Sequence, residues 1–298
     1  MIIDNILDSI GNVPLVRLSR MSSGKVFAKA EFLNPGGSIK DRVAKYIIQK
    51  AMADGQLRPG MTIIEATSGN TGIGLCLVGV RSGFRVICVM PDNVSGERKR
   101  IIQALGGEAI LTPAEQNLNG CLQRVQDIMQ SDSDNFFWVN QFANPYNPQI
   151  HYQQTGPEIW RDTNGEVDVF IAGIGSGGTL QGVGKFLKEQ NPRVKIVAVE
   201  PRNSTSLLSR EPGFHQIQGI GDGFIPAVLD VNLIDMVFAV SDEEAIDTTR
   251  RLACEEGLLV GTSSGANISA ALHMDNGRNK IVTVLPDRAE RYFSTALL

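Results

Sequence analysis

The pattern that decides the fold lies in residues 167–200, VDVFIAGIGSGGTLQGVGKFLKEQNPRVKIVAVE. An apolar run over residues 167–172 leads into a glycine-rich turn and then into a helical pattern over residues 180–189. A second apolar run follows at residues 195–199. Both runs are of strand length and rich in β-branched residues. Strand, helix and strand in this order predict one unit of a parallel sheet.

The same alternation runs along most of the chain. The further runs that predict strands are residues 62–65, 85–90, 109–111, 137–139, 236–240 and 280–285. The further helical patterns are residues 97–105, 120–130, 242–256 and 265–273. We expect residues 141–150, with two prolines and two asparagines, to link two sheets. The predicted fold is therefore α/β, with two doubly wound, mostly parallel sheets covered by helices.

Composition excludes several classes of protein. The 298 residues are 42% hydrophobic and 20% charged, with a net charge of −4 and no basic block, so we expect no nucleic-acid partner. The longest apolar runs are too short to cross a bilayer, and the first residues lack a signal-peptide pattern. Four scattered cysteines without CxxC spacing indicate free thiols in a reducing cytoplasm rather than a metal site.

Residues 34–42, NPGGSIKDR, place Lys40 at the expected start of a helix behind two glycines. The positive end of a helix dipole disfavours the ammonium form of a lysine in the first turn. A deprotonated amine in a glycine-lined site suits Schiff-base chemistry. The alternative is a surface lysine on an amphipathic helix.

Residues 67–72, TSGNTG, follow the expected strand at residues 62–65 and open an apolar helix. The hydroxyls of Thr67, Ser68 and Thr71 join backbone N–H groups freed at a helix N-terminus, and Asn70 adds an amide. Such donors suit a carboxylate or a phosphate. The alternative is a helix cap without a ligand.

Residues 173–179, GIGSGGT, form a second glycine-rich loop that predicts a phosphate site. Its glycines also satisfy G-x-G-x-x-G, and Glu200 ends the next expected strand. An NAD-dependent dehydrogenase is therefore an alternative that this region alone leaves open.

A third loop, residues 261–265 (GTSSG), opens another apolar helix, and Ser263 or Ser264 offers a hydroxyl to a bound group. Only pyridoxal 5′-phosphate (PLP) uses the lysine, the anion loop and the phosphate loop together.

The chain resembles the cysteine synthase (O-acetylserine sulfhydrylase) and cystathionine β-synthase family of fold-type II PLP enzymes. The segments that carry the resemblance are IGNVPLVRL, NPGGSIKDR, EATSGNTG, MPDNVSGERK, QFANPYNPQIHYQQTGPEIW, GIGSGGT, QGIGDGFIP, GTSSG and PDRAERYFST. The last of these looks most like the B-type isozyme. The resemblance implies a homodimer whose chain has a smaller substrate-binding domain (residues 35–139) nested in a larger phosphate-binding domain (residues 1–34 and 140–298).

The resemblance also implies residue roles. Lys40 would bind PLP covalently and serve as the acid and base at the substrate α-carbon. Gln141 would complete a substrate-carboxylate site whose other members are Thr67, Ser68, Gly69, Asn70 and Thr71. Asn70 would also meet the cofactor. Ser263 would face its pyridine nitrogen, with Ser264 as the adjacent alternative. The phosphate would be held by Gly175, Ser176, Gly177, Gly178 and Thr179.

The implied reaction is a β-replacement on an activated serine or cysteine, by α,β-elimination to aminoacrylate and attack by sulfide or a thiol. Cysteine synthesis is the leading expectation. The family usually has a small apolar residue where this chain has Asp222. An acid there favours the alternative, a cysteine-consuming β-lyase or a lanthionine- or cystathionine-forming enzyme that releases hydrogen sulfide. We expect Asp222 to act on the thiol or water, or to be a solvated loop residue. A non-catalytic binding protein is disfavoured because the motif residues are present.

Residues 95–100, SGERKR, are interpreted as an exposed helix start with solvated basic side chains.

Overall fold

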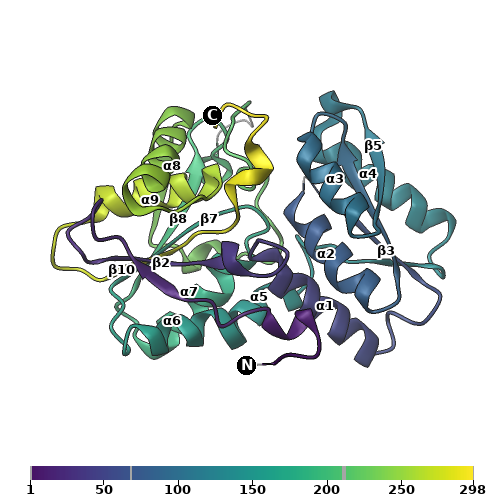
Figure 1. Cartoon of the computed structure of the whole chain (residues 1–298), viewed down its shortest axis with the longest axis horizontal. Helices are drawn as coiled ribbons and strands as arrows, with labels where there is room; N and C mark the ends of the chain where they lie inside the picture. Colours follow the sequence, from purple (N-terminus) through teal and green to yellow (C-terminus); the bar gives the residue numbers. More distant parts are fainter. Residues whose placement is uncertain (1, 68, 210–212, 298) are drawn as a thin grey trace. The chain divides into compact units, whose positions relative to one another are not determined.

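The computed structural model describes residues 2–67, 69–209 and 213–297. The chain divides into two compact units. The smaller unit contains Met1–Ile10 and Asn34–Tyr146, and the larger unit contains Gly11–Leu33 and Asn147–Leu298. Each unit is built around its own sheet (Figure 1).

The smaller unit has a four-stranded sheet in the order β5-β4-β3-β6, and all its pairs are parallel. The strands are β3 (Thr62–Ala66), β4 (Arg85–Pro91), β5 (Glu108–Thr112) and β6 (Phe136–Trp138). The helices are α1 (Lys40–Ala53), α2 (Asn70–Arg81), α3 (Gly96–Ala104) and α4 (Asn117–Ser131). Every residue of β3 is buried, as parallel strands covered on both faces require.

The larger unit has a six-stranded sheet in the order β1-β2-β10-β7-β8-β9. Its strands are β1 (Leu15–Arg17), β2 (Val26–Lys29), β7 (Val169–Gly173), β8 (Lys195–Pro201), β9 (Met236–Val240) and β10 (Ile281–Val284). Only the β1–β2 pair is antiparallel among the described strands. The helices are α6 (Gly156–Asp162), α7 (Gly178–Gln190), α8 (Asp242–Glu256) and α9 (Thr262–Met274).

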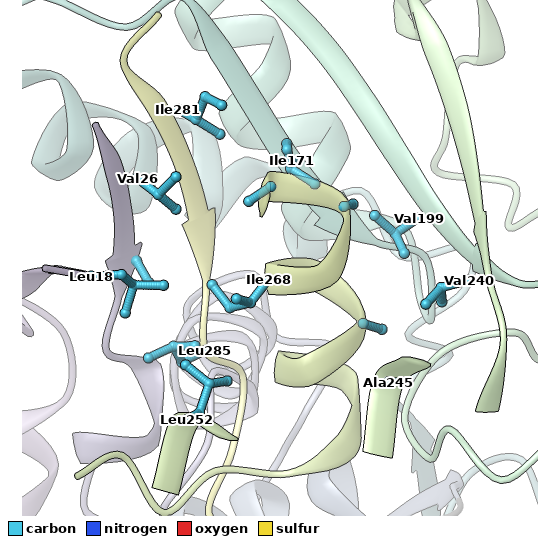
Figure 2. Close-up of a cluster of buried hydrophobic side chains, with 14 of the residues drawn as sticks. Leu18, Val26, Ile171, Val199, Val240, Ala245, Leu252, Ile268, Ile281 and Leu285 are labelled. Carbon is cyan, nitrogen blue, oxygen red and sulfur yellow. The ribbon is translucent and has the colours of Figure 1, made fainter. Parts of the chain in front are cut away.

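Alternating side chains of the larger sheet enter two separate cores, because successive residues of a strand point to opposite faces. On one face Ile171 and Val199 pack against α8 and α9, where Ile268 lies central in the cluster (Figure 2). On the other face Phe170 and Ile196 pack with residues of α6 and α7. Figure 1 shows these two pairs of helices on opposite sides of the sheet. The sheet therefore has helices on both faces, and its strand-to-helix loops lie at the carboxyl ends of the parallel strands.

Helix α5 (Tyr146–Ile150) begins at the last residue of the smaller unit, and a π-helix, η4 (His151–Thr155), follows it within the larger unit. The short 3-10 helices are η1 (Ile6–Ser9), η2 (Glu31–Leu33), η3 (Ala114–Gln116), η5 (Ser206–Leu208), η6 (Val231–Leu233) and η7 (Ala289–Tyr292).

The units differ from the expected division at three places, because residues 1–10, 34 and 140–146 belong to the smaller unit. Lys45 of α1 donates to the carbonyl oxygen of Leu7 at 2.8 Å. Tyr146 donates to Asp54 at 2.5 Å, and its ring packs edge-on against Tyr46. These contacts attach residues 1–10 and 140–146 to α1 and its C-terminal cap. No local sequence pattern predicts them.

Every expected strand and helix is present within a few residues of its predicted bounds. The sequence interpretation missed β1 and β2, which are only three and four residues long. Residues 141–150 do link the two sheets, since they lie between β6 and β7, but part of the link, Tyr146–Ile150, is the unpredicted helix α5. The prolines concealed these helical turns, because Pro148 lies within α5 and Pro157 stands in the first turn of α6, where a missing N–H costs nothing.

Candidate active site

Lys40 is the first residue of α1. The side chain of the next residue, Asp41, holds the glycine-containing loop that precedes the helix. Asp41 is fully buried, and its Oδ2 accepts the backbone N–H of Gly36 at 2.6 Å. A β-carbon at residue 36 would come within 2.5 Å of Asp41 Oδ1, so the close approach requires glycine there. The Ser38 hydroxyl accepts the Lys40 N–H at 3.3 Å. The glycine loop thus folds against the helix start and leaves the Lys40 side chain half-buried.

Thr67 and Gly69 lie between the end of β3 and the start of α2, and residues 70–72 are in the first turn of α2. The buried Thr67 hydroxyl accepts the Gly69 N–H at 3.0 Å. The Thr71 hydroxyl donates to the side-chain oxygen of Gln141 at 2.6 Å, and both residues are buried. Ser68, which was also expected here, lies outside the described residues. The structure therefore joins Thr71 and Gln141, which are 70 positions apart.

Lys40 lies beside this loop within the smaller unit. A β-carbon at Gly74, on the second turn of α2, would come within 3.0 Å of the Lys40 carbonyl oxygen. Asn70 follows β3 and Gln141 follows β6, and these two strands are parallel neighbours. Their carboxyl ends therefore meet at one edge of the sheet. Asn70, Thr71 and Gln141 lie at that edge, and the start of α1 packs beside α2. We call these three candidate residues, together with Lys40, the lysine half-site.

Arg98 corrects the interpretation of residues 95–100 as wholly exposed. Its side chain is 3% exposed and lies against the loop, since a β-carbon at Gly69 would come within 2.5 Å of Arg98 Nε. The arginine and the glycine are 29 positions apart in the sequence, and no local pattern predicts their contact. Gly69 was expected in the substrate site, and the close packing of Arg98 explains why glycine stands there.

In the larger unit, the glycine-rich loop joins β7, which ends at Gly173, to α7, which begins at Gly178. Gly177 adopts a left-handed conformation with φ 78°, which favours glycine. The buried Ser176 hydroxyl accepts the side-chain N–H of Asn147 at 3.0 Å. Thr179 Oγ1 and His151 Nε2 are 3.4 Å apart. The sequence interpretation missed Asn147 and His151, because the prolines around them indicated a linker.

Two further segments of the larger unit meet this loop. A β-carbon at Gly175 would overlap the carbonyl oxygen of Gly219. A β-carbon at Gly219 would in turn lie 3.9 Å from the Ser263 hydroxyl, on the first turn of α9. Ser264 is fully buried, and its hydroxyl has no hydrogen-bond partner among the described residues. Ser263 thus lies with the glycine-rich loop, in what we call the phosphate half-site.

Asp222 lies half-buried on the same loop as Gly219. The residue before it, Gly221, is fixed by three contacts. Its N–H donates to the Ile174 carbonyl oxygen at 2.9 Å, and its own carbonyl oxygen accepts the Ser204 hydroxyl at 3.0 Å. His215 Nε2 lies 3.0 Å from that same oxygen. These contacts hold the turn before Asp222 against Ile174, which belongs to the glycine-rich loop of the phosphate half-site.

The donors of the phosphate half-site fit a phosphate monoester. Residues 175–179 contribute two hydroxyls and the backbone N–H groups at the start of a 13-residue helix, and the loop contains no acidic side chain. The dinucleotide alternative needs a carboxylate for a ribose. Both oxygens of Glu200 instead accept the Leu207 N–H, at 3.3 and 3.2 Å, and burial raises the pKa of Glu200 to about 6. Glu200 thus holds the turn at η5.

Residues 6–287 match the family model described as pyridoxal-phosphate dependent enzyme. The chain belongs to this family. The match covers nearly the whole sequence and both half-sites, and it decides the choice of cofactor in favour of PLP. The α/β fold and the PLP cofactor that the sequence predicted are confirmed.

Similarity to individual proteins shows to which branch of this family the chain belongs. The chain is 45% identical over 306 residues to cysteine synthase A of Escherichia coli (strain K12), covering 99% of this chain and 94% of the relative. A crystal structure of cysteine synthase from Entamoeba histolytica is 40% identical with a TM-score of 0.94, covering 100% of this chain and 91% of that one. A hydrogen sulfide-producing enzyme (Fn1220) from Fusobacterium nucleatum is 39% identical with a TM-score of 0.94, covering 98% and 100%. The chain is therefore a member of the cysteine synthase family.

No helix among residues 2–67, 69–209 and 213–297 is long and apolar enough to span a membrane. Cys76, Cys88 and Cys121 are buried free thiols, and Cys254 is an exposed one.

Proposed function

We propose that this protein is a PLP-dependent β-replacement enzyme that makes cysteine from an activated serine and sulfide. The observation that carries the proposal is the 45% identity to a cysteine synthase over almost the full length of both chains. The two half-sites agree with it, because one contains a helix-start lysine beside polar groups that suit a carboxylate and the other suits a phosphate.

Each half-site has a distinct share in the reaction. PLP, when bound, stabilises the negative charge that develops on the α-carbon of an amino acid. The Lys40 amine binds the cofactor and moves the proton of the substrate α-carbon. Thr67, Asn70, Thr71 and Gln141 hold the substrate carboxylate, with Ser68 and Gly69 in the same loop. Carboxylate binding positions the β-substituent for departure and for replacement by sulfide.

The phosphate half-site anchors the cofactor and sets its electronics. Gly175, Ser176, Gly177, Gly178 and Thr179 hold the phosphate, and Asn147 and His151 orient the two hydroxyls of that loop. Ser263 would face the pyridine nitrogen of bound PLP. A neutral hydroxyl does not hold that nitrogen protonated as a carboxylate does, which favours elimination of a β-substituent over transamination.

A second candidate function is the release of hydrogen sulfide from cysteine, with a thiol or water as the acceptor. Asp222 favours it, because a half-buried carboxylate disfavours anionic sulfide and can accept a proton from an incoming thiol or water. The similarity to the hydrogen sulfide-producing enzyme of Fusobacterium nucleatum agrees with this candidate. We assign Asp222 the role of choosing between the two reactions.

We also propose that the protein is a cytoplasmic homodimer. The free, buried state of Cys76, Cys88 and Cys121 suits a reducing compartment. Gel filtration with light scattering measures the oligomeric state, and an elution mass near 32.3 kDa would contradict a dimer.

The experiment that tests the function is the visible absorption spectrum of the PLP-loaded protein, recorded before and after adding O-acetylserine, O-phosphoserine, serine and cysteine separately. We expect a band of lysine-bound cofactor that O-acetylserine changes and sulfide restores, with cysteine as the product. Lys40→Ala should remove the band, whereas Lys50→Ala, a control on the same helix, should leave it unchanged. A response to cysteine alone, with sulfide release, would favour the second candidate. A protein that binds no PLP would contradict both.

A further inference from the structure

Glu65 is the one carboxylate of β3, and it is fully buried. Its two oxygens each accept a backbone N–H from the segment after β6, Oε2 from Asn140 at 2.7 Å and Oε1 from Gln141 at 3.2 Å. Asn140 adopts a left-handed conformation with φ 50°, which is uncommon for a residue other than glycine. The carboxyl group therefore holds a turn that the backbone alone disfavours.

The turn fixes the direction of the Gln141 side chain. The side-chain oxygen of Gln141 accepts the Thr71 hydroxyl at 2.6 Å, and its nitrogen lies 3.4 Å from the carbonyl oxygen of Ala66. Ala66 is the residue directly after Glu65. Gln141 is thus held at its backbone by Glu65 and at its side chain by Ala66, both of β3, and by Thr71 on the first turn of α2.

We propose that Glu65 is a positioning residue for substrate binding, which acts by holding the left-handed turn at Asn140 so that the Gln141 amide is presented to the substrate carboxylate. The inference rests on the proposed function, because it takes Gln141 to be a carboxylate ligand. Glu65 itself contacts neither substrate nor cofactor in this assignment.

The burial of Glu65 explains how an acidic side chain can lie next to a site that binds the substrate carboxylate. Removal from water raises the pKa of Glu65 to about 8, against the opposing effect of the N–H groups of Gln141 and Asn140. The carboxyl group is therefore mainly protonated at pH 7. A neutral carboxyl group can accept backbone hydrogen bonds without repelling the carboxylate of an incoming amino acid.

The test is a double-mutant cycle in the PLP-loaded enzyme with Glu65→Gln, Gln141→Ala and the combination of both. Glutamine keeps one oxygen acceptor but places an amide nitrogen against the second backbone N–H. We expect Glu65→Gln to raise the KM for O-acetylserine about tenfold with kcat within about twofold, because one hydrogen bond to a bound anion is weakened. In the Gln141→Ala background, Glu65→Gln should change KM by less than about twofold, because the amide it positions is gone. Glu108→Gln, an exposed glutamate on β5 of the same sheet, is the matched control.

Two further variants test the same turn if Glu65→Gln folds poorly. Asn140→Ala should raise KM in the same direction, because alanine disfavours the left-handed conformation, and Asn140→Gly should restore it. The dissociation constant for L-serine, measured from the absorbance of bound PLP, gives a readout that does not require turnover. This dissociation constant should rise about tenfold in Glu65→Gln, because the hydrogen bond from Gln141 to the serine carboxylate is weakened.

The outcomes separate the inference from the function on which it rests. If Gln141→Ala raises KM but the effects of Glu65→Gln and Gln141→Ala multiply, Glu65 does not act through Gln141 and the inference is wrong. An increase in L-serine affinity or an unchanged affinity in both Glu65→Gln and Asn140→Ala would overturn it as well. If the wild-type enzyme performs no β-replacement while L-serine binding still depends on both residues, only the proposed function fails.

Discussion

The Thr71 hydroxyl and the Gln141 side-chain oxygen are joined by a hydrogen bond of 2.6 Å between the first turn of α2 and the segment after β6. Both side chains are buried, so the bond is shielded from competing water. The pair connects two loops at the carboxyl ends of neighbouring parallel strands. This is the position in which open α/β sheets bind their ligands.

Gln141→Ala should lower kcat/KM for O-acetylserine about ten- to a hundredfold, because a hydrogen bond to a charged group contributes about 1.5–3 kcal/mol. The loss should appear mainly in KM. Steady-state kinetics measure it, and Gln123→Ala, an exposed glutamine on α4 of the same unit, is the control. Equal KM values for the variant and the control would show that Gln141 does not bind substrate.

Gly175→Ala should weaken PLP binding about tenfold or more. The added β-carbon would overlap the backbone oxygen of Gly219, which cannot rotate away, so one of the two loops must shift. Titration of the apoprotein with PLP, followed by absorbance, gives the dissociation constant. Gly96→Ala is the control, because a β-carbon at residue 96 meets nothing within 4 Å. Wild-type affinity in Gly175→Ala would contradict the placement of the phosphate at this loop.

The free energy of unfolding should depend on pH through Glu65. Its pKa is about 8 in the folded protein and ordinarily 4.5, so the folded state binds this proton more tightly. The stabilisation is fully present below pH 4.5 and is lost as pH rises through 8, by at most about 1.4 kcal/mol per pH unit. Glu65→Gln should remove this slope. Urea unfolding between pH 5 and 8, at about one-unit steps, measures the difference from wild type.

Glu200 in the larger unit also has a raised pKa, of about 6, so the slope between pH 6 and 8 is the part that reports Glu65. The cysteine thiols near β3 titrate above this range. Cys88 on β4 faces Cys76 on α2, and the hydrogen bond between the two thiols, followed by burial, raises the pKa of Cys88 well above 9.0. Burial also raises the pKa of Cys121 on α4 from 9.0. Glu108→Gln is again the control, since the hydrogen bond from Arg85 lowers the pKa of Glu108 below 4.5. A slope between pH 6 and 8 that persists unchanged in Glu65→Gln would assign the titration to another group.

Asp222→Asn should change the choice of reaction. If the carboxylate accepts a proton from an incoming thiol or water, the variant should release sulfide from cysteine at least about tenfold more slowly. Its rate with O-acetylserine and sulfide should not fall and should rise by up to about threefold, because the variant no longer repels anionic sulfide. Methylene-blue detection of sulfide and a cysteine assay measure the two rates. Asp247→Asn on the surface of α8 is the control, and parallel changes in both reactions would make Asp222 an ordinary loop residue.

The sequence by itself determined the local features of this protein. Strand length, helical spacing and glycine-rich turns predicted the alternation of elements, because hydrophobic periodicity depends on neighbours within a few residues. The same local chemistry identified Lys40 and the loops at residues 67–72 and 173–179 as candidate sites. Resemblance to a family added Gln141, which no local pattern marks, and chose Ser263 from the two serines that the loop at residues 261–265 offers.

The tertiary structure decided which of these groups meet, and which unnoticed residues support them. Glu65 and Gln141 are 76 positions apart, and they meet only because β3 and β6 are adjacent in the sheet. Asn147 and Ser176 meet across 29 positions, although the prolines near Asn147 indicated a linker. Arg98 is buried against Gly69, although its sequence neighbourhood is charged. Strand order and the burial of polar groups are properties of packing over long sequence separations, which local patterns do not contain.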